Sequence, residues 1–350
     1  MIPFQISVSK GWLHDFGGFS FTESYYDDPY HRAKTDAEID RYIQESFTDM
    51  PVYNFESNLV QQEFIHPGII RVGALQPNLI LGRLLGAEYV FPEGADADID
   101  RSPLKGIASK EELPEPDGLL AHPAIRHFDR QIRSVMQDSG KICIPPFFWD
   151  TSGRATIHGI LTTAHKLVGE DFFILMYEDV DLAHAILTWI TESYLLLIEH
   201  YARLGRIDIT SAHIGECSGC LVSLPGFSEF AQPYIERISE RWPVRVHSCG
   251  RSDHLLESLT SIRNLYSLDV GSDTSVASIR ARLGSRFLIE VAPPVEILLE
   301  GSDEEAAARW AETTIIENQG GPLEVKIHLE PGYSLKNVQI VYQRFLDTGQ

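Results

Sequence analysis

The chain has 350 residues and carries 29 lysines and arginines against 50 aspartates and glutamates, a formal net charge of −21. This length suits one large α/β domain or two ordinary ones, and four cysteines are too few for a disulfide-stapled miniprotein. So strong a negative charge would repel nucleic-acid phosphates and anionic membranes, which removes both from the expected partners.

The first 120 residues have an irregular pattern. They contain an aromatic and acidic stretch, Phe21–Tyr30, and a predicted helix over Asp36–Phe47, and they close in the Pro- and Glu-rich run ASKEELPEPDG. We therefore expect residues 1–120 to be an N-terminal elaboration packed on the barrel described below. Residues 121–350 are then the main part of a single domain.

No long apolar run is present in the chain. The N-terminal residues lack the core of a signal peptide, and the longest apolar region, Leu182–Leu204, is interrupted by charged residues. These features predict a cytoplasmic protein whose cysteines are thiols.

Beyond residue 120, helical patterns alternate with short β-branched runs. Helices are predicted over Ala124–Gln137, Thr156–Leu167, Val180–Leu204, Phe227–Arg241, His254–Ile262, Val276–Leu283, Asp303–Asn318 and Leu335–Phe345. Strands are predicted over residues 142–148, 172–177, 207–214, 244–248, 265–270, 286–292 and 324–329.

Strands that alternate with amphipathic helices indicate a parallel sheet with right-handed crossovers. Seven such strands, with one more expected nearer the N-terminus, predict an α/β fold of the (β/α)8 TIM-barrel type with an irregular N-terminal extension. A doubly wound sheet is the alternative. No GxGxxG or GxxxxGK[ST] pattern follows a predicted strand, so dinucleotide and P-loop sites have no support.

In a TIM barrel the functional residues gather at the carboxyl ends of the strands. The chemistry-bearing residues at or next to the predicted strand ends are Asp150, Glu178, Glu216, Cys217, Cys220, His247, Cys249, Asp269, Glu290 and His328. His247 and Cys249 stand two apart on one strand, so both side chains point the same way and can hold one metal ion. The alternative is a buried cysteine beside a hydrogen-bonded histidine.

The remaining candidates are assigned by their position around that pair. Cys217 and Cys220 have the CxxC spacing of metal or redox sites, which favours zinc when a His-x-Cys strand end lies beside them. His328 ends the last strand, which a closed barrel brings near the others. Glu216 and Asp269 are the candidate catalytic residues, either orienting the ligands or serving as oxygen ligands that substrate replaces. The alternative is that both carboxylates cap helices.

Several segments resemble the uroporphyrinogen decarboxylase superfamily. The run ECSGCLVSLPGFSEFAQPYIERI, which begins at Glu216, is similar to the segment in which an acid-Ser-aromatic-Ala-Gly motif precedes F-x-x-F-x-x-P-Y. VHSCGRSDHLLESL resembles the His-x-Cys-Gly strand and helix of the methylcobalamin:coenzyme M methyltransferases, and SIRARLGSRFLIEVAPPVEILLEGSDEE and EVKIHLEPGYSLKNV look like the segments that follow. The likeness covers roughly Asn78 to the C-terminus. It implies a TIM barrel, zinc held by His247 and Cys249, and a corrinoid as co-substrate.

Two departures from the family pattern bear on function. The R-Q-A-G-R motif, which holds porphyrin carboxylates in the decarboxylases, is absent from residues 1–30, and this argues against porphyrinogen decarboxylation. The last zinc ligand of the methyltransferases is a cysteine near the end of the final strand, where this chain has His328. The resemblance therefore implies ligation by His247, Cys249 and His328, with Cys217, Glu216 or substrate as the fourth ligand.

Three functions are open at this point. The first is a zinc-dependent methyltransferase that exchanges a methyl group between a corrinoid, either methylcobalamin or a corrinoid protein, and a small molecule. The second is a decarboxylase-like lyase that acts on a tetrapyrrole or small carboxylate through His328 and an acid from a strand end. The third is a non-catalytic corrinoid-binding protein in which His247 and Cys249 are structural. The aromatic N-terminal third is also a candidate homodimer contact.

Overall fold

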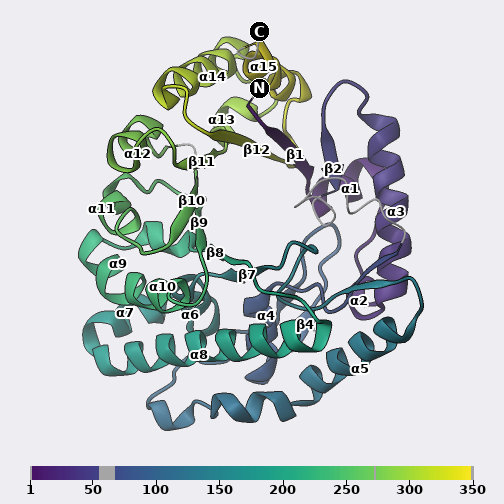
Figure 1. Ribbon diagram of the computed structural model, residues 1–350, viewed down its shortest axis with the longest axis vertical. Helices are drawn as coiled ribbons and strands as arrows, with labels where there is room; N and C mark the ends of the chain where they lie inside the picture. Colours follow the sequence, from purple (N-terminus) through teal and green to yellow (C-terminus); the bar gives the residue numbers. More distant parts are fainter. Residues whose placement is uncertain (1, 55–67, 272, 348–350) are drawn as a thin grey trace.

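A computed structural model describes residues 2–54, 68–271 and 273–347. Its main sheet has eight strands in the order β2-β1-β12-β11-β10-β9-β8-β7, and all neighbours are parallel. The strands are β1 (Phe4–Val8), β2 (Val52–Asn54), β7 (Arg154–His158), β8 (Ser211–Gly215), β9 (Val244–Ser248), β10 (Leu265–Val270), β11 (Leu288–Val291) and β12 (Leu323–Leu329). The sheet curls into a ring with helices outside it (Figure 1), which confirms the predicted (β/α)8 barrel-like fold.

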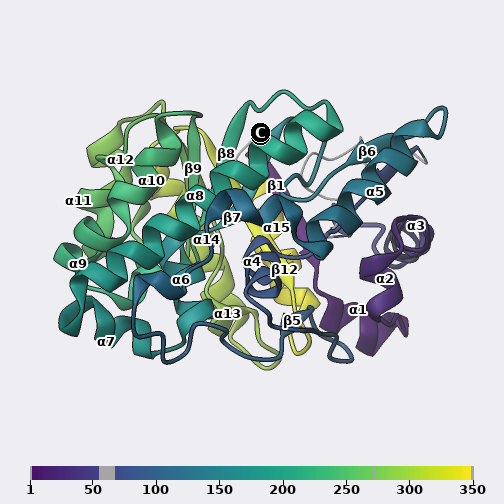
Figure 2. The same ribbon diagram turned by 90° about the horizontal axis from the view of Figure 1, so that it is seen from below.

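Helices surround the ring on its outer side. The α-helices are α1 (Lys10–Gly17), α2 (Glu23–Asp27), α3 (Pro29–Ser46), α4 (Pro77–Leu84), α5 (Pro123–Gln137), α6 (Ile160–Val168), α7 (Asp171–Glu178), α8 (Val180–Gly205), α9 (Leu224–Phe230), α10 (Gln232–Ser239), α11 (Leu256–Leu259), α12 (Val276–Leu283), α13 (Val295–Leu298), α14 (Glu304–Asn318) and α15 (Leu335–Asp347). Short 3-10 turns are η3 (Lys110–Glu112), η4 (Pro116–Ala121), η5 (Cys217–Leu221) and η6 (Asp253–Leu255). In the view of Figure 2, α1 and α13, which follow β1 and β11, lie at the same edge of the molecule, the rim where the strands end.

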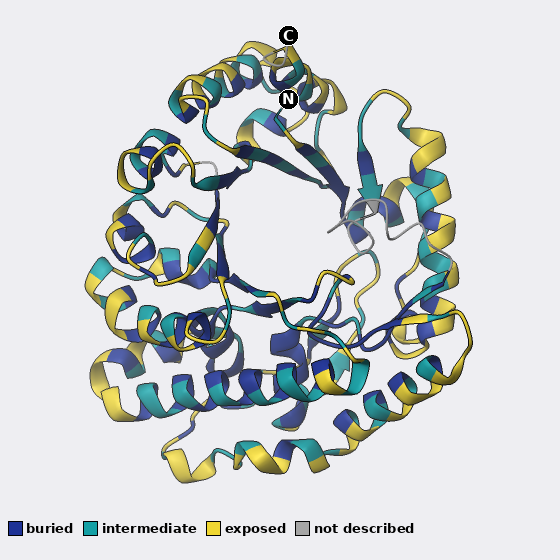
Figure 3. Ribbon diagram, in the orientation of Figure 1, coloured by how far each residue is buried: buried dark blue, intermediate teal, exposed yellow. Residues whose placement is uncertain are grey.

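The strands alternate between apolar outward positions and polar inward positions. Along β12 the apolar residues are buried, whereas Glu324, Lys326 and His328 between them are only partly buried. Successive side chains of a strand point to opposite faces, so the apolar set packs under the helices and the polar set lines the barrel. Figure 3 shows the same arrangement, with buried strands and exposed residues on the outer helix faces. The barrel interior is therefore polar enough to hold a reactive site.

Three predicted elements differ from the structure in kind or place, and the helix predicted over Phe227–Arg241 is divided between α9 and α10. Residues 172–177 form helix α7 instead of a strand, because a short apolar run fits a buried helix as well as a buried strand. Glu178 consequently ends a helix. The predicted helix Thr156–Leu167 begins with strand β7 and becomes helical only at Ile160. The predicted strand over 142–148 contains β6 (Ile142–Ile144), which pairs with β3 (Ile69–Arg71) outside the main sheet.

The N-terminal third contributes directly to the main sheet. β1 lies between β2 and β12, so both β1 and β2 come from the first 54 residues. A separate antiparallel pair, β4 (Tyr89–Val90) and β5 (Asp98–Ile99), follows later in the same third. The division at residue 120 stays a prediction. In the described ranges, no helix is both long enough and apolar enough to cross a membrane.

Candidate metal centre

Three predicted ligands meet at the ends of two neighbouring strands. β8 ends at Gly215 and leads through Glu216 to Cys217, while β9 carries His247 and is followed by Cys249. One ligand atom of each of Cys217, His247 and Cys249 lies within 4.8 Å of the other two. We call these residues the metal triad. It is the only such group of three or more His, Cys, Asp or Glu residues in the part of the chain that the structure describes.

Hydrogen bonds and nearby charges shift the pKa values of all three residues of the metal triad. A hydrogen bond from Cys217, reinforced by one from His247, lowers the pKa of Cys249 to about 4. The same contact with Cys249, together with burial, raises the pKa of Cys217. Burial lowers the pKa of His247, but the negative charge of Asp269 outweighs this effect and raises it to about 9. Cys249 is therefore a thiolate at neutral pH, which is the form that binds metals.

A buried charge network lies behind His247. Its Nδ1 atom is 2.9 Å from Oδ2 of Asp269, which leaves Nε2 as the nitrogen for a metal. Arg245 pairs with that same Asp269 oxygen. It also donates hydrogen bonds to the two carboxylate oxygens of Glu290, each at 2.6 Å. Lys326 pairs with Glu290 from β12. Burial raises the pKa of Asp269, but the Arg245 charge overcomes it and holds the pKa well below its usual value, so Asp269 stays ionised.

The residues present fit zinc. Two cysteine sulfurs and one imidazole are the donors that Zn²⁺ prefers, and a carboxylate behind a metal-binding histidine is a recurrent way to fix the ring. The sequence predicts an orienting role for Asp269, whereas Arg245 is not among the candidates that it indicates. Arg245 stands two residues before His247 on β9, so the alternation of the strand is the signal that could have found it.

Glu216 turns away from the metal triad. Its Oε1 accepts hydrogen bonds from the backbone N–H and the hydroxyl of Thr162, both at 2.8 Å, and its Oε2 accepts one from the Leu161 N–H at 3.2 Å. These groups begin α6, so the carboxylate caps that helix. A Cβ on Gly159 would stand 2.2 Å from Oε2, so only glycine allows the approach. Burial raises the pKa of Glu216 to about 7 against these hydrogen bonds.

The other candidates lie outside the metal triad. The Cys220 thiol donates a hydrogen bond to the Cys217 carbonyl at 3.1 Å. Nδ1 of His328 is 2.8 Å from the Ser7 hydroxyl, and β10 and β11 separate its strand from β9. Asp150 is buried and accepts a hydrogen bond from the Ser152 N–H at 2.8 Å. Ligation by His328 stays a prediction.

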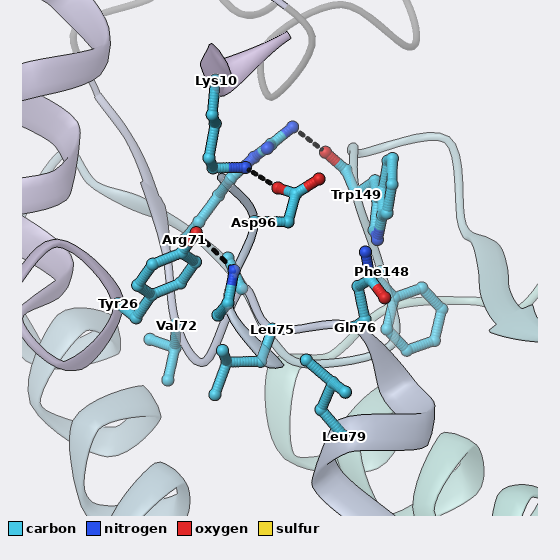
Figure 4. Close-up of a pocket in the computed structure, with 12 residues that line it drawn as sticks. Lys10, Tyr26, Arg71, Val72, Leu75, Gln76, Leu79, Asp96, Phe148 and Trp149 are labelled. Atoms are coloured by element: carbon cyan, nitrogen blue, oxygen red, sulfur yellow. Dashed lines mark hydrogen bonds and ion pairs between the residues drawn. The ribbon is translucent and has the colours of Figure 1, made fainter. Parts of the chain in front are cut away.

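A small pocket lies elsewhere on the rim, near the ends of β1 and β3 (Figure 4). Lys10 follows β1 and pairs with Asp96 at 2.6 Å, and Arg71 ends β3 and donates a hydrogen bond to the Trp149 carbonyl. The first contact lies within the N-terminal third, and the second ties that third to the segment before β7. The Asp96 charge also acts to raise the pKa of His158 at the end of β7.

Comparisons with known proteins identify a fold but no family. No family model matches the chain, and no curated protein matches its sequence. The chain is similar in structure to a methyltransferase from Methanosarcina mazei, with a TM-score of 0.60 and 16% sequence identity, over 100% of this chain and 94% of that chain. At 16% sequence identity, this similarity shows a shared fold and nothing about function. The chain has the fold of that methyltransferase along its whole length.

Proposed function

We propose that the protein is a zinc-dependent methyltransferase that moves a methyl group between a corrinoid and a small molecule. The observation that carries the proposal is the metal triad, set at the mouth of a barrel that the chain shares with a methyltransferase. Three protein ligands leave the fourth tetrahedral position of zinc for substrate, as in catalytic sites, whereas structural sites are closed by four. Cys220 would complete a closed Cys3His set, but it lies outside the metal triad.

Each residue of the centre has a defined task in this reaction. Cys217, His247 and Cys249 would hold zinc, and the ion would supply the positive charge that lowers the pKa of an acceptor thiol and keeps it nucleophilic. Asp269 orients the His247 ring through Nδ1, and Arg245 keeps Asp269 ionised. The barrel wall aligns the methyl donor with the acceptor and limits access of water.

Exposed apolar side chains on the rim support a bulky second substrate. Leu221 is 62% exposed in η5, directly after β8, and Val295 is 50% exposed in α13, which follows β11. A corrinoid presents a large, partly apolar face that such side chains can contact. Free methylcobalamin and a corrinoid protein are the two candidate forms of this substrate, and the homodimer stays a prediction.

Metal analysis is the first test. Protein purified without an affinity tag should contain close to one zinc per chain, and content below about a tenth of an equivalent with no uptake on reconstitution would overturn the proposal. Cys217→Ser should lose the metal. Cys220→Ser is the matched control, because it makes the same change at the other cysteine of the CxxC run, which lies outside the metal triad, and it should keep the metal.

Methyl transfer is then followed in the visible spectrum. Mixing the zinc-loaded protein with methylcobalamin and a series of small thiols should convert methylcobalamin to the cob(I)alamin form, and Cys217→Ser should abolish this change. If no acceptor produces a spectral change while zinc is bound, the methyltransferase assignment is wrong.

A further inference from the structure

His158 ends β7 and takes no part in the functions assigned above. It pairs in register with Gly215 of β8, and Gly215 pairs with His247 of β9. Residues at one register position of a parallel sheet point to the same face, so His158 and His247 face the barrel interior at the same height. Ile157 and Gly159 on either side are buried while His158 is only partly buried, as expected for the one inward-facing residue of the three.

Gly215 leaves the position between these two histidines without a side chain. A Cβ placed there would have only the Ile157 carbonyl oxygen within 4 Å, at 3.7 Å, an ordinary contact. Strands two apart in a sheet are separated by about 9–10 Å. Apart from chain neighbours, no other atom lies within 4 Å of that Cβ, so the space over Gly215 has room for ligand atoms, with the metal triad on one side and His158 on the other.

His158 presents an unused hydrogen-bonding group at this place. Its Nδ1 is buried and has no hydrogen-bond partner among the described residues. Burial, followed by the charges of His247 and Lys166, lowers the pKa of His158 to about 4 although Asp96 opposes them, so the ring is neutral near pH 7. A neutral imidazole offers one N–H donor and one acceptor nitrogen. Leaving such a buried group unpaired is costly, which favours a ligand that pairs it.

We propose that the space over Gly215 binds the small-molecule substrate and that His158 hydrogen-bonds an uncharged polar group of that substrate. This inference rests on the proposed function and names its substrate class: a small molecule with a hydroxyl, carbonyl or amide group a few bonds from its reacting atom. A neutral imidazole offers one donor and one acceptor, so the site selects against an apolar group at this position.

The first test uses thiols that differ only at the far end. In cobalt(II)-substituted protein, thiolate-to-cobalt absorption reports the binding of 2-mercaptoethanol and of 1-propanethiol, which has a methyl group in place of the hydroxyl. We expect 2-mercaptoethanol to bind about 5- to 10-fold more tightly than 1-propanethiol, the difference made by one hydrogen bond. His158→Leu should abolish this preference and His158→Gln should restore part of it, with cobalt content unchanged. An unaltered preference in His158→Leu overturns the proposal.

The second test does not depend on a metal. In protein with ¹⁵N-labelled histidine, the His158 ring resonances, assigned by their loss in His158→Gln, should shift saturably on addition of 2-mercaptoethanol. Gly215→Val should prevent the shift because its side chain fills the space, and its Cβ would meet the Ile157 carbonyl oxygen only at an ordinary contact distance. If metal does not bind but the shift occurs, the zinc function fails and the His158 site stands. No shift, with or without metal, refutes the site itself.

Discussion

Two histidines end strands on the same rim of the barrel, yet they lie in different surroundings. His247 on β9 has two cysteines within ligand distance and an ionised carboxylate at its Nδ1. His328 on β12 has the Ser7 hydroxyl at its Nδ1, and Glu330 lies 3.7 Å from its Nε2. The strand order explains why cysteines surround His247 and not His328. β8, which leads to Cys217, is the hydrogen-bonded neighbour of β9, whereas β10 and β11 lie between β9 and β12. The candidate metal centre is therefore formed by neighbouring strands of the sheet.

The largest expected effect separates these two histidines. His247→Ala should lower zinc affinity by more than about 100-fold, because it removes a ligand, whereas His328→Ala should retain the full zinc content. Zinc content after dialysis and competition with a chelator measure both. Loss of zinc from His328→Ala with an intact fold would instead support the fourth ligand that the family resemblance implies.

A smaller effect is expected behind the His247 ring. Asp269→Asn keeps the shape of the side chain but removes the charge that orients the ring, and such changes lower metal affinity about 10- to 100-fold. Glu324→Gln is the matched control, because Glu324 also lies on an inward position of the barrel but on β12, which β11 and β10 separate from the strand of His247. Equal zinc affinity in the Asp269→Asn variant and the natural protein would show that the ring is held by other contacts.

The smallest effect concerns Glu216, the acid that caps α6 beside the metal triad. Its pKa is raised by burial from the usual 4.5 to about 7, so folding takes up a proton between these values. Stability from this group is complete below about pH 4.5 and is lost as the pH rises through 7, by up to about 3 kcal/mol in the metal-free protein.

Urea unfolding at several pH values measures this contribution. The free energy of unfolding of the natural protein should fall between pH 5 and pH 7.5 relative to that of Glu216→Gln, which cannot titrate. Parallel pH profiles for the two proteins would contradict the raised pKa and indicate that the hydrogen bonds from Leu161 and Thr162 keep the carboxylate ionised.

Secondary-structure prediction succeeded where periodicity was long or strictly alternating. The helix predicted over Val276–Leu283 and the strand over residues 244–248 match α12 and β9. It failed at residues 172–177, where six apolar residues fit either a helix or a strand, and at β7, whose residues merge into the helix that follows. The helix predicted over Thr156–Leu167 includes His158, so this residue is missing from the candidates at strand ends, although it ends β7.

The sequence by itself determined the barrel class and the pairing of His247 with Cys249, because alternation along a strand and spacing of two are local properties of the chain. Only the tertiary structure decided that Cys217 joins them, that Glu216 turns to the start of α6, and that His158 faces the same space across Gly215. These outcomes depend on which strands become neighbours, and that is settled by hydrogen bonding and packing between segments far apart in the sequence.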